Sequence, residues 1–367
     1  MPEGQSSALV LEKPKQLTRQ EFELPELQGN DAVVRVEACG LCGTDHEQYT
    51  GALPAGFAFI PGHEAVGVIE AAGDDFRERH QVAVGDRVAV EVFQSCRECP
   101  ACDAHEYRRC ERHGLANMYG FIPADKAPGL WGGYAEYQYL GPDCMLHHVP
   151  DSLDPVLATI FNPLGAGVRW GVHVPGTSAG DKVAVQGPGI RGLSALVAAK
   201  EAGADFVAVT GYGPNDAPRL AMAEKFGADL TVDVAVEDPA AAFKKATGGL
   251  ADIVVDVSAK APAAFAQSVW LARPAGTIVR AGTTGAAASP ELWPDAIVFK
   301  ELNIIGALGV DDTAYAEALA ILASGKYPFD ELTRETAGFD GLEDLLIRMS
   351  GEAPDAAPPP VHGVFVP

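Results

Sequence analysis

The segment KVAVQGPGIRGLSAL, residues 182–196, carries the strongest indication of the fold. An apolar run is followed by Gly187, Gly189 and Gly192 in G-x-G-x-x-G spacing, and then by a helix-forming run. In this context the first glycine allows a tight turn, the second lets the backbone approach a pyrophosphate, and the third lets helix and strand pack closely. The helix N-terminus then offers free N–H groups to the anion. The segment therefore predicts a strand, a turn and a helix that bind a dinucleotide.

Strand-like and helix-like segments alternate on both sides of this loop, from about residue 155 to residue 310. Alanine-rich helical runs separate the apolar runs, which are 182–186, 206–210, 252–257 and 277–282. Nearly continuous apolar strands alternating with helices are typical of a parallel sheet that is covered on both faces. We therefore predict an α/β fold with a Rossmann, doubly wound dinucleotide-binding domain over residues 164–310.

The end of the second of these strands bears on the choice of cofactor. NAD sites place an acidic residue there for the adenosine ribose, but the chain reads Thr210-Gly211-Tyr212, and Asp216 follows in a longer loop. Arg191 and Arg219 lie close enough in sequence to meet a 2′-phosphate, although arginines on a solvated helix face give the same pattern. The choice between NAD and NADP is therefore open, with the balance toward NAD. The candidate cofactor-binding residues are Gly187, Gly189, Ile190, Arg191, Gly192, Gly211, Arg219 and Gly282.

Length, composition and charge limit the possible functions. The 367 residues suggest two domains, and 47% hydrophobic with 21% charged residues is ordinary for a globular protein. The formal net charge of −23 argues against binding to nucleic acid or to an anionic membrane, because both require a basic face. The first residues contain no apolar run typical of a secretory signal, and no apolar stretch reaches the length of a membrane span. We expect a cytoplasmic location.

Four cysteines occur within one short segment, SCRECPACDAHEYRRC, residues 95–110. Their spacing is C-x2-C-x2-C-x7-C, and four thiolates this close together suit the closed tetrahedral site of a structural zinc ion. Two disulfides or an iron–sulfur cluster are the alternatives. The segment predicts a metal-stabilised lobe formed by Cys96, Cys99, Cys102 and Cys110.

A second set of metal ligands lies upstream. Cys42, followed about twenty residues later by His63 and Glu64, supplies a thiolate, an imidazole and a carboxylate. A catalytic zinc ion uses three protein ligands and keeps one position open. Pairing Cys39 with Cys42 as a C-x2-C site is a weaker alternative, because the other closely spaced cysteines already form a complete set of four ligands and leave no second C-x2-C for that pair to join.

Six segments together resemble one known family, the zinc-dependent medium-chain alcohol dehydrogenases, in the branch of the polyol, threonine and secondary-alcohol dehydrogenases. They occur in the family's order and extend over nearly the whole chain. The segments are CGLCGTD (39–45), PGHEAVGVI (61–69), VGDRVAV (84–90), the four-cysteine segment (95–110), GGYAEY (132–137) and GPGIRG (187–192).

The resemblance implies two zinc ions per chain. Cys42 and His63 would bind the catalytic zinc, with Glu64 as a further ligand or as a carboxylate beside it. The family's third ligand is a cysteine, glutamate or aspartate, and Asn162, a poor zinc ligand, occupies that position. Glu64 and water complete the shell, or Asn162 binds through its carbonyl oxygen, or no catalytic zinc binds. The structural zinc would be held by Cys96, Cys99, Cys102 and Cys110.

The resemblance also implies how protons are handled. Thr44 occupies the position of the hydroxyl residue that takes the proton of the substrate alcohol. Asp45 would orient His63 from the side opposite the metal. His46 is a candidate for a proton relay, although a surface histidine fits the sequence equally well.

The implied architecture has a GroES-like, β-rich catalytic domain over residues 1–163, completed by residues 311–367. The implied reaction transfers a hydride between a secondary alcohol and NAD(P)+ and yields a ketone. A bulky or cyclic alcohol would suit an apolar lining formed by Tyr49, Phe57, Phe59, Phe93 and Trp131. Homodimers or homotetramers are expected, with NIIGAL (303–308) as the pairing edge strand.

Two other functions remain as alternatives. A zinc-independent reductase of enones or quinones uses the same scaffold, but it does not need the ligands Cys42, His63 and Glu64. A zinc-stabilised binding protein without enzymatic activity does not need the phosphate loop.

Overall fold

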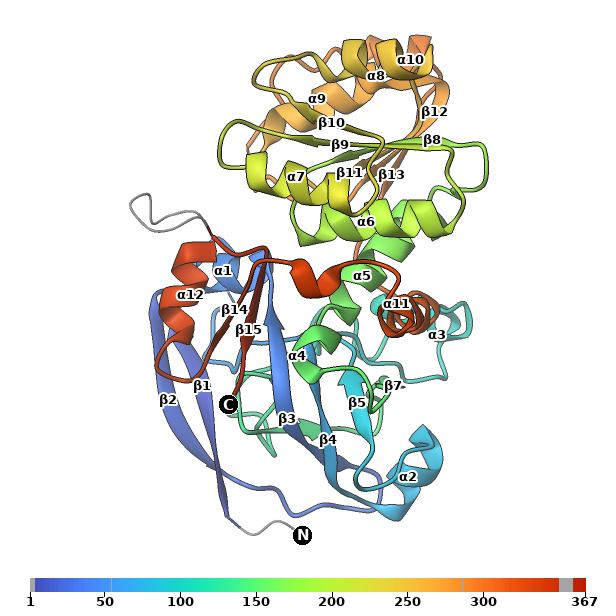
Figure 1. Ribbon diagram of the computed structural model, residues 1–367. Coiled ribbons are helices and arrows are strands. Elements are labelled where there is room, and N and C mark those ends of the chain that lie inside the picture. The colour runs from blue at the N-terminus through green and yellow to red at the C-terminus, as the bar shows by residue number, and fades with distance from the viewer. Residues whose placement is uncertain (1–3, 54, 286, 350–358) are drawn as a thin grey trace. The chain divides into compact units, whose positions relative to one another are not determined.

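The chain forms two compact units in the computed structural model, which describes residues 4–53, 55–285, 287–349 and 359–367 (Figure 1). The first unit comprises Met1–Asn162, Asp311–Ser324 and Phe329–Pro367. The second unit comprises Pro163–Val310 and Gly325–Pro328. The low-complexity loop expected at 351–360 lies mostly outside the described residues.

A six-stranded parallel sheet forms the centre of the second unit. Its strand order is β10-β9-β8-β11-β12-β13, so the sheet grows outward in both directions from β8, its first strand in the chain. All five strand pairs are parallel. This order confirms the predicted doubly wound Rossmann sheet. The strands are β8 (Lys182–Gln186), β9 (Phe206–Gly211), β10 (Leu230–Asp233), β11 (Ala251–Asp256), β12 (Ala272–Arg280) and β13 (Asn303–Gly306).

Helices cover both faces of this sheet (Figure 1), with α6 and α7 on one side and α8, α9 and α10 on the other. Val183, Ala184 and Val185 of β8 are fully buried, as expected for a strand between two helical layers. The helices are α5 (Phe161–Val168), which continues as the π-helix η2 (Arg169–His173), α6 (Ile190–Glu201), α7 (Ala217–Lys225), α8 (Pro239–Thr247), α9 (Pro262–Leu271) and α10 (Asp295–Phe299).

The first unit is built on a mostly antiparallel sheet with the order β14-β15-β3-β4-β5-β7, and β6 also pairs with β3. Among the described strands of this sheet, β14 and β15 are the one pair that runs parallel. A separate antiparallel hairpin, β1–β2, lies at the N-terminal end. The strands are β1 (Gln5–Lys13), β2 (Gln16–Glu23), β3 (Ala32–Leu41), β4 (Ala65–Ala72), β5 (Arg87–Val90), β6 (Tyr137–Leu140), β7 (Leu146–His148), β14 (Arg334–Ala337) and β15 (His362–Phe365).

The C-terminal strand β15 pairs with the end of β3, where Val364 lies opposite Gly40. The end of the chain therefore supports the strand that leads directly into Cys42. Short helices fill the connections: α1 (Gly43–Thr50), α2 (Asp74–His80), α3 (Pro100–Asp103), η1 (Tyr107–Arg109), α4 (Pro155–Ala158), α11 (Asp312–Ser324), η3 (Phe329–Glu331) and α12 (Leu342–Met349).

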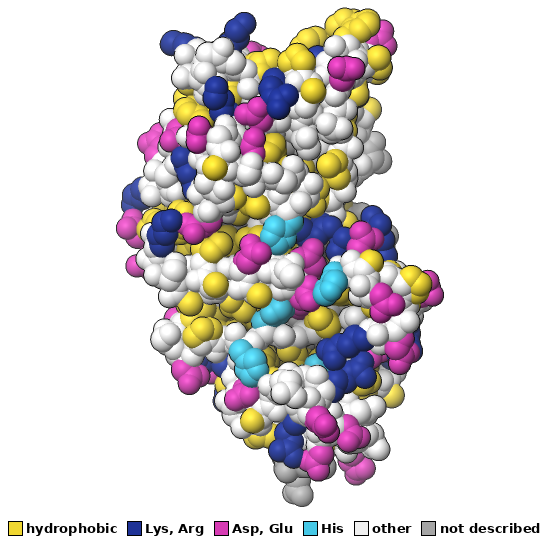
Figure 2. Space-filling model, turned by 90° about the vertical axis from the view of Figure 1, so that its right-hand side faces the viewer, with side chains coloured by type: hydrophobic (Ala, Val, Ile, Leu, Met, Phe, Trp, Pro, Cys, Tyr) yellow, Lys and Arg dark blue, Asp and Glu magenta, His cyan; other side chains and the backbone are white. Residues whose placement is uncertain are grey.

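The surface carries charges of both signs. Figure 2 shows acidic side chains spread over the face that it presents, with lysine and arginine side chains interspersed among them. Within the described residues, no helix combines the length and the apolar character that crossing a membrane requires.

One buried histidine in the first unit ties β15 to its surroundings. His362 is 2% exposed, and its Nδ1 accepts a hydrogen bond from Arg334 Nε at 2.9 Å. Its Nε2 lies 3.0 Å from Thr159 Oγ1, whose hydroxyl donates to the carbonyl of Val156, so Nε2 is the donor in this pair. The imidazole is therefore neutral, and burial together with the charge of Arg334 lowers its pKa to about 3.

This histidine predicts a loss of stability in mild acid. The unfolded chain takes up the proton near the ordinary pKa of 6.5 and the folded chain only near 3, so the stabilisation is lost as the pH falls through this window. We expect His362 to account for about 2 kcal/mol of the loss between pH 7 and pH 5. Urea unfolding of wild type and His362→Gln at both pH values measures the difference. The exposed His148 provides the control variant His148→Gln, and an unchanged pH dependence in His362→Gln would refute the assignment.

Candidate active site and metal centres

Cys42 is fixed by the start of helix α1. Its Sγ accepts a hydrogen bond from the Thr44 N–H at 3.3 Å, and its own N–H donates to Asp45 Oδ2 at 2.8 Å. These reciprocal bonds form a capping box in which cysteine replaces the usual serine or threonine. The local sequence C-G-T-D therefore sets the positions of both the thiol and the carboxylate. A helix N-terminus also favours the thiolate form of cysteine.

His63 reaches the same place from the loop before β4. Its Nε2 lies 3.1 Å from Cys42 Sγ, and its Nδ1 lies 3.5 Å from Asp45 Oδ1. The preceding Gly62 has a φ of +90°, and a Cβ at that position would press against the ring of Tyr134. Only glycine fits this turn, and the turn directs the imidazole between the thiol and the carboxylate.

The group formed by Cys42, Asp45 and His63 fits a metal ion. All three side chains are buried, and their ligand atoms lie within 4.8 Å of one another. A tetrahedral zinc ion holds a sulfur and a nitrogen about 3.5 Å apart, close to the 3.1 Å between Cys42 Sγ and His63 Nε2. Because Asp45 lies on the Nδ1 side of the ring, a proton on Nδ1 would face a carboxylate, and Nε2 would then present its lone pair to a metal.

The electrostatics around this group also favour a cation. Burial raises the pKa of Tyr134 well above its usual value, and the negative charges of Asp45, Cys42 and Glu64 raise it further. Cys39 is affected in the same way, by burial first and by Asp45 next. Several acidic groups thus share one buried region, where a divalent cation would offset their mutual repulsion.

The other predicted residues surround this group. Glu64 is 1% exposed, but it does not belong to the group of ligand atoms, because its carboxylate lies against Gly40. Asn162 is also buried, and its Nδ2 donates to the carbonyl of His63 at 3.5 Å. Thr44 is half-buried on the first turn of α1, and His46, two residues further along the helix, is buried.

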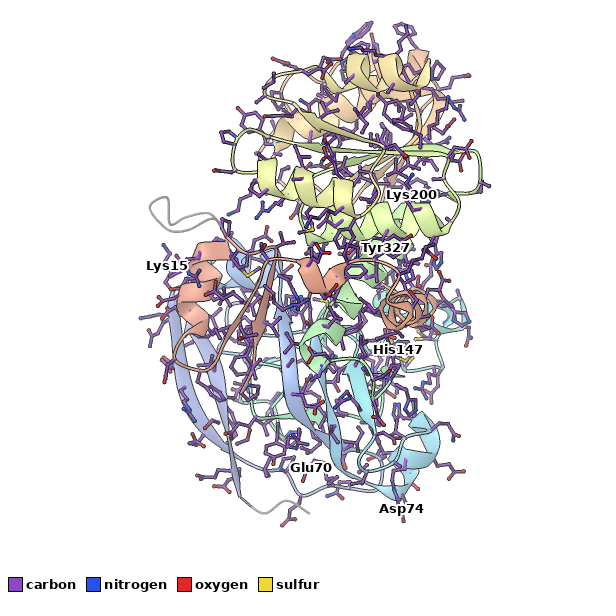
Figure 3. The ribbon with its side chains drawn as sticks, viewed as in Figure 1. Lys15, Glu70, Asp74, His147, Lys200 and Tyr327 are labelled. Carbon is purple, nitrogen blue, oxygen red and sulfur yellow. The ribbon has the colours of Figure 1, made fainter. Side chains whose placement is uncertain are left out.

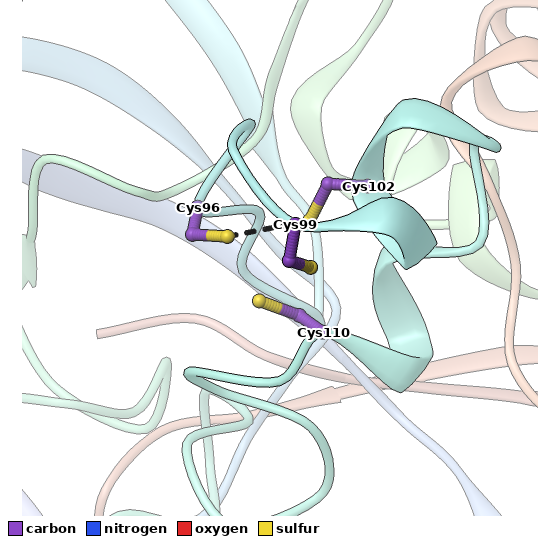
Figure 4. Close-up of side chains that lie close together, drawn as sticks. All are labelled: Cys96, Cys99, Cys102 and Cys110. Carbon is purple, nitrogen blue, oxygen red and sulfur yellow. Dashed lines mark hydrogen bonds between the residues drawn. The ribbon is translucent and has the colours of Figure 1, made fainter.

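The four-cysteine lobe forms a closed quartet (Figure 4). Cys96 Sγ and Cys102 Sγ are 3.7 Å apart, close to the roughly 3.8 Å between two sulfurs around a tetrahedral zinc ion. All seven cysteines of the chain are free, so the two-disulfide alternative is not observed. The backbone N–H groups of Glu111 and Cys102 lower the pKa of the Cys99 thiol to about 6, which favours a thiolate ligand.

A cavity of about 620 Å³ lies over the glycine loop in the second unit. It opens at the carboxyl ends of β8, β9 and β11, where the strand order reverses, and parallel α/β sheets bind their ligands there. Six of the predicted cofactor residues line it: Gly187, Gly189, Arg191, Gly192, Gly211 and Arg219.

Two predicted cofactor residues do not line this cavity. Ile190 begins helix α6. Gly282 packs against the backbone of Ser258, and a side chain at position 282 would collide with the Ser258 carbonyl. Ser258 does line the cavity, together with Asn215 and Lys260, and the sequence analysis missed all three. The available signal was the position of Ser258 two residues after the end of β11, a neighbour of β8.

Four of the five aromatic residues expected to line the substrate site are buried in hydrophobic clusters of the first unit. Tyr49 and Phe59 pack in one hydrophobic core cluster, Trp131 in a second and Phe93 in a third. Only Phe57 is exposed, and it lines a small cavity of about 280 Å³ with Phe59.

Comparisons with known proteins agree with this architecture. Residues 28–151 match the family model of the alcohol dehydrogenase GroES-like domain, and residues 192–324 match that of the zinc-binding dehydrogenases. The chain is 63% identical over 361 residues to a probable alcohol dehydrogenase of Mycobacterium tuberculosis, and the match covers 98% of each chain.

More distant relatives share the same fold. An erythritol/L-threitol dehydrogenase of Mycolicibacterium smegmatis is 30% identical, with 89% of each chain covered. The solved structure of a protein assigned as a zinc-binding dehydrogenase from Sinorhizobium meliloti, bound to NADP, is 28% identical with a TM-score of 0.84 over 100% of each chain.

These matches define the protein as an oxidoreductase with a GroES-like and a Rossmann domain. The chain belongs to the zinc-dependent medium-chain alcohol dehydrogenase family, and it is an NAD(P)-dependent alcohol dehydrogenase.

Proposed function

We propose that the protein transfers a hydride between a secondary alcohol and NAD+, with a zinc ion held by Cys42 and His63. The observation that carries this proposal is the buried contact of Cys42 Sγ with His63 Nε2. The other ring nitrogen of His63, Nδ1, lies beside the carboxylate of Asp45. The secondary-alcohol class rests on the branch of the family that the sequence resembles. The expectation of a bulky or cyclic substrate rests on five aromatic residues, four of which pack in hydrophobic clusters of the first unit.

Each residue near Cys42 has a distinct task in this proposal. Zinc bound there would act as a Lewis acid and lower the pKa of a substrate alcohol toward neutrality. Asp45 holds the tautomer of His63. Thr44, half-buried at the start of α1, accepts the substrate proton, and His46 on the same helix is the candidate to pass it on. Asn162 supplies a third ligand, and Glu64 stays beside the group as a buried negative charge.

The free-energy cost of burying several acidic side chains together disfavours the zinc-independent alternative. Buried carboxylates and thiols are expensive to desolvate unless they are paired with a cation or hydrogen-bonded. An enzyme that needs no metal gains nothing from placing Cys42, Asp45 and Glu64 in one buried region.

The preference for NAD is supported by the position of Asp216. A Cβ added to Gly211, at the end of β9, would lie only 2.9 Å from the Cβ of Asp216. NAD sites place an acidic side chain at the end of the second strand, where this chain has Gly211. Asp216 therefore brings an acidic side chain into the same space from the following loop. Its carboxylate accepts hydrogen bonds from the Tyr212 N–H at 2.9 Å and from Arg219 at 3.1 Å. Arg219 is thus paired with Asp216 rather than available to a 2′-phosphate.

We propose a homodimer formed through the edge of the cofactor-domain sheet. β13 is the last strand in the order, and it carries exposed residues such as Ile304. An unpaired apolar edge strand can pair with a second copy about a two-fold axis.

Replacing Cys42 tests the proposed chemistry. Cys42→Ser should lower kcat/KM for alcohol oxidation by roughly a thousandfold, because the Lewis acid supplies several kcal/mol. Zinc analysis should show a fall from two ions per chain to one, and NADH fluorescence should show unchanged cofactor binding. Cys39 is a buried thiol near the end of β3 and outside the metal group, so Cys39→Ser should retain both zinc ions and activity. Wild-type turnover in Cys42→Ser would contradict the zinc mechanism.

Replacing Asp216 tests the cofactor preference. Asp216→Ser removes the repulsion of a 2′-phosphate and releases Arg219, so the ratio of kcat/KM for NADP to that for NAD should rise roughly tenfold or more. Steady-state kinetics with both cofactors measures this ratio. Asp238→Asn, at the cap of α8 and outside the cavity lining, is the control. An unchanged ratio of kcat/KM for NADP to kcat/KM for NAD in Asp216→Ser would show that Asp216 does not set the preference for NAD.

Replacing Ile304 tests the dimer. Sedimentation velocity should give a dimer for the wild type and a monomer for Ile304→Glu, because a charge on an edge strand opposes pairing. Thr231→Glu, on the opposite edge strand β10, should remain dimeric. A wild-type monomer would exclude the proposed assembly.

A further inference from the structure

The side-chain amide of Asn162 has a defined orientation. One of its terminal atoms faces the carbonyl oxygen of His63 at 3.5 Å, and that atom also lies 3.3 Å from the hydroxyl of Tyr315. A carbonyl oxygen only accepts hydrogen bonds, so the atom facing it is Nδ2. The two N–H groups of the amide are therefore directed to His63 and Tyr315. Neither hydrogen bond uses Oδ1, the only atom of this side chain that can bind a metal.

Tyr315 is held firmly in its place. It is fully buried on α11, and its ring lies 5.2 Å from the ring of Phe161 and 5.5 Å from that of His147. His147, labelled in Figure 3 beside α11, in turn bonds the buried Glu91 at 2.6 Å. Packing on two sides thus fixes the phenol ring and, with it, the hydroxyl that faces Asn162.

The start of α11 is attached to the four-cysteine lobe. Arg108 lies 3.8 Å from Asp311, and His105 lies 3.5 Å from Asp312. Both basic residues belong to the segment between Cys102 and Cys110. The lobe therefore contributes to the position of the helix that carries Tyr315.

We propose that Tyr315 is a positioning residue for the catalytic metal: its hydroxyl holds the amide of Asn162 so that Oδ1 serves as the third protein ligand. This inference rests on the proposed function, in which Cys42 and His63 bind zinc. It gives Asn162 a defined role at a position where the family uses a charged ligand.

Two physical effects make this hydrogen bond matter. A neutral amide oxygen is a weak ligand for zinc, and donating both N–H groups to acceptors shifts electron density toward its oxygen. The same two bonds oppose a flip of the amide that would turn the N–H groups toward the metal. Without the Tyr315 hydroxyl, a buried N–H loses its partner and the side chain gains freedom to turn. Outer hydrogen bonds of this kind commonly change metal affinity by about tenfold to a hundredfold.

The alternative is that Tyr315 only fills space. Tyr315→Phe separates the two roles, because phenylalanine retains the ring packing against Phe161 and His147 and removes only the hydroxyl. A packing role predicts unchanged metal affinity, and a positioning role predicts a weaker catalytic zinc site with a folded protein.

The experiment measures zinc retention directly. The zinc-loaded enzyme is dialysed against graded concentrations of a chelator, and the zinc left per chain is determined. In Tyr315→Phe, the catalytic zinc should be lost at a chelator concentration roughly tenfold or more lower than in the wild type. The lobe zinc should be lost at the same chelator concentration in both proteins. Tyr139→Phe, which removes another buried tyrosine hydroxyl that bonds Asp31, should behave as the wild type.

A second variant keeps the test decisive. Asn162→Ala removes the amide, so adding Tyr315→Phe to it should cause no further loss of zinc affinity. An equal loss in both backgrounds would show that Tyr315 acts through the fold and would overturn the inference, as would an unchanged affinity in Tyr315→Phe alone. A wild-type chain that holds only the lobe zinc would instead overturn the proposed function and the inference with it. Thermal unfolding of each variant confirms that the affinities compared are those of folded proteins.

Discussion

The capping box at the start of α1 is the local constraint on which the catalytic site depends. It places the thiol of Cys42 and the carboxylate of Asp45 on one helical turn, and His63 enters between them. The surrounding sheet fixes both partners, because β3 leads into Cys42 and β4 begins just after His63. A hydrogen bond from the Gly40 N–H to the Glu64 carbonyl connects the two segments directly. The C-terminal strand β15 supports the same end of β3.

The two metal groups have different designs. The four cysteines of the lobe form a closed set of ligands, which leaves a tetrahedral ion no position for a substrate. In the proposed function, the group at Cys42 offers fewer strong ligands, which would leave a zinc ion positions for a substrate oxygen. The lobe is nevertheless not a separate appendage, because its segment between Cys102 and Cys110 contacts the start of α11. A structural metal can in this way influence the geometry of a site to which it contributes no ligand.

The sequence predicted the elements that are encoded by short, local patterns. The strand, glycine turn and helix at 182–196 are such a pattern, and so is C-G-T-D at the start of α1. The hairpin β1–β2 was not predicted, because β2 is polar and only half-buried and lacks the apolar alternation of a typical strand. Tyr315 and Ser258 were missed because their positions depend on contacts between segments far apart in the chain. The burial of the aromatic residues could not be predicted for the same reason, since burial is a property of the folded chain.

The central claim is that the chain holds a catalytic metal through Cys42 and His63 in addition to the metal of its four-cysteine lobe. X-ray absorption spectroscopy at the zinc edge of the purified enzyme tests it most directly. A mixed coordination shell is predicted. The four lobe thiolates and Cys42 should supply sulfur atoms at about 2.3 Å from zinc, and the site at His63 should supply nitrogen or oxygen atoms at about 2.0 Å from zinc. A shell of sulfur alone, with one zinc ion per chain, would contradict the account.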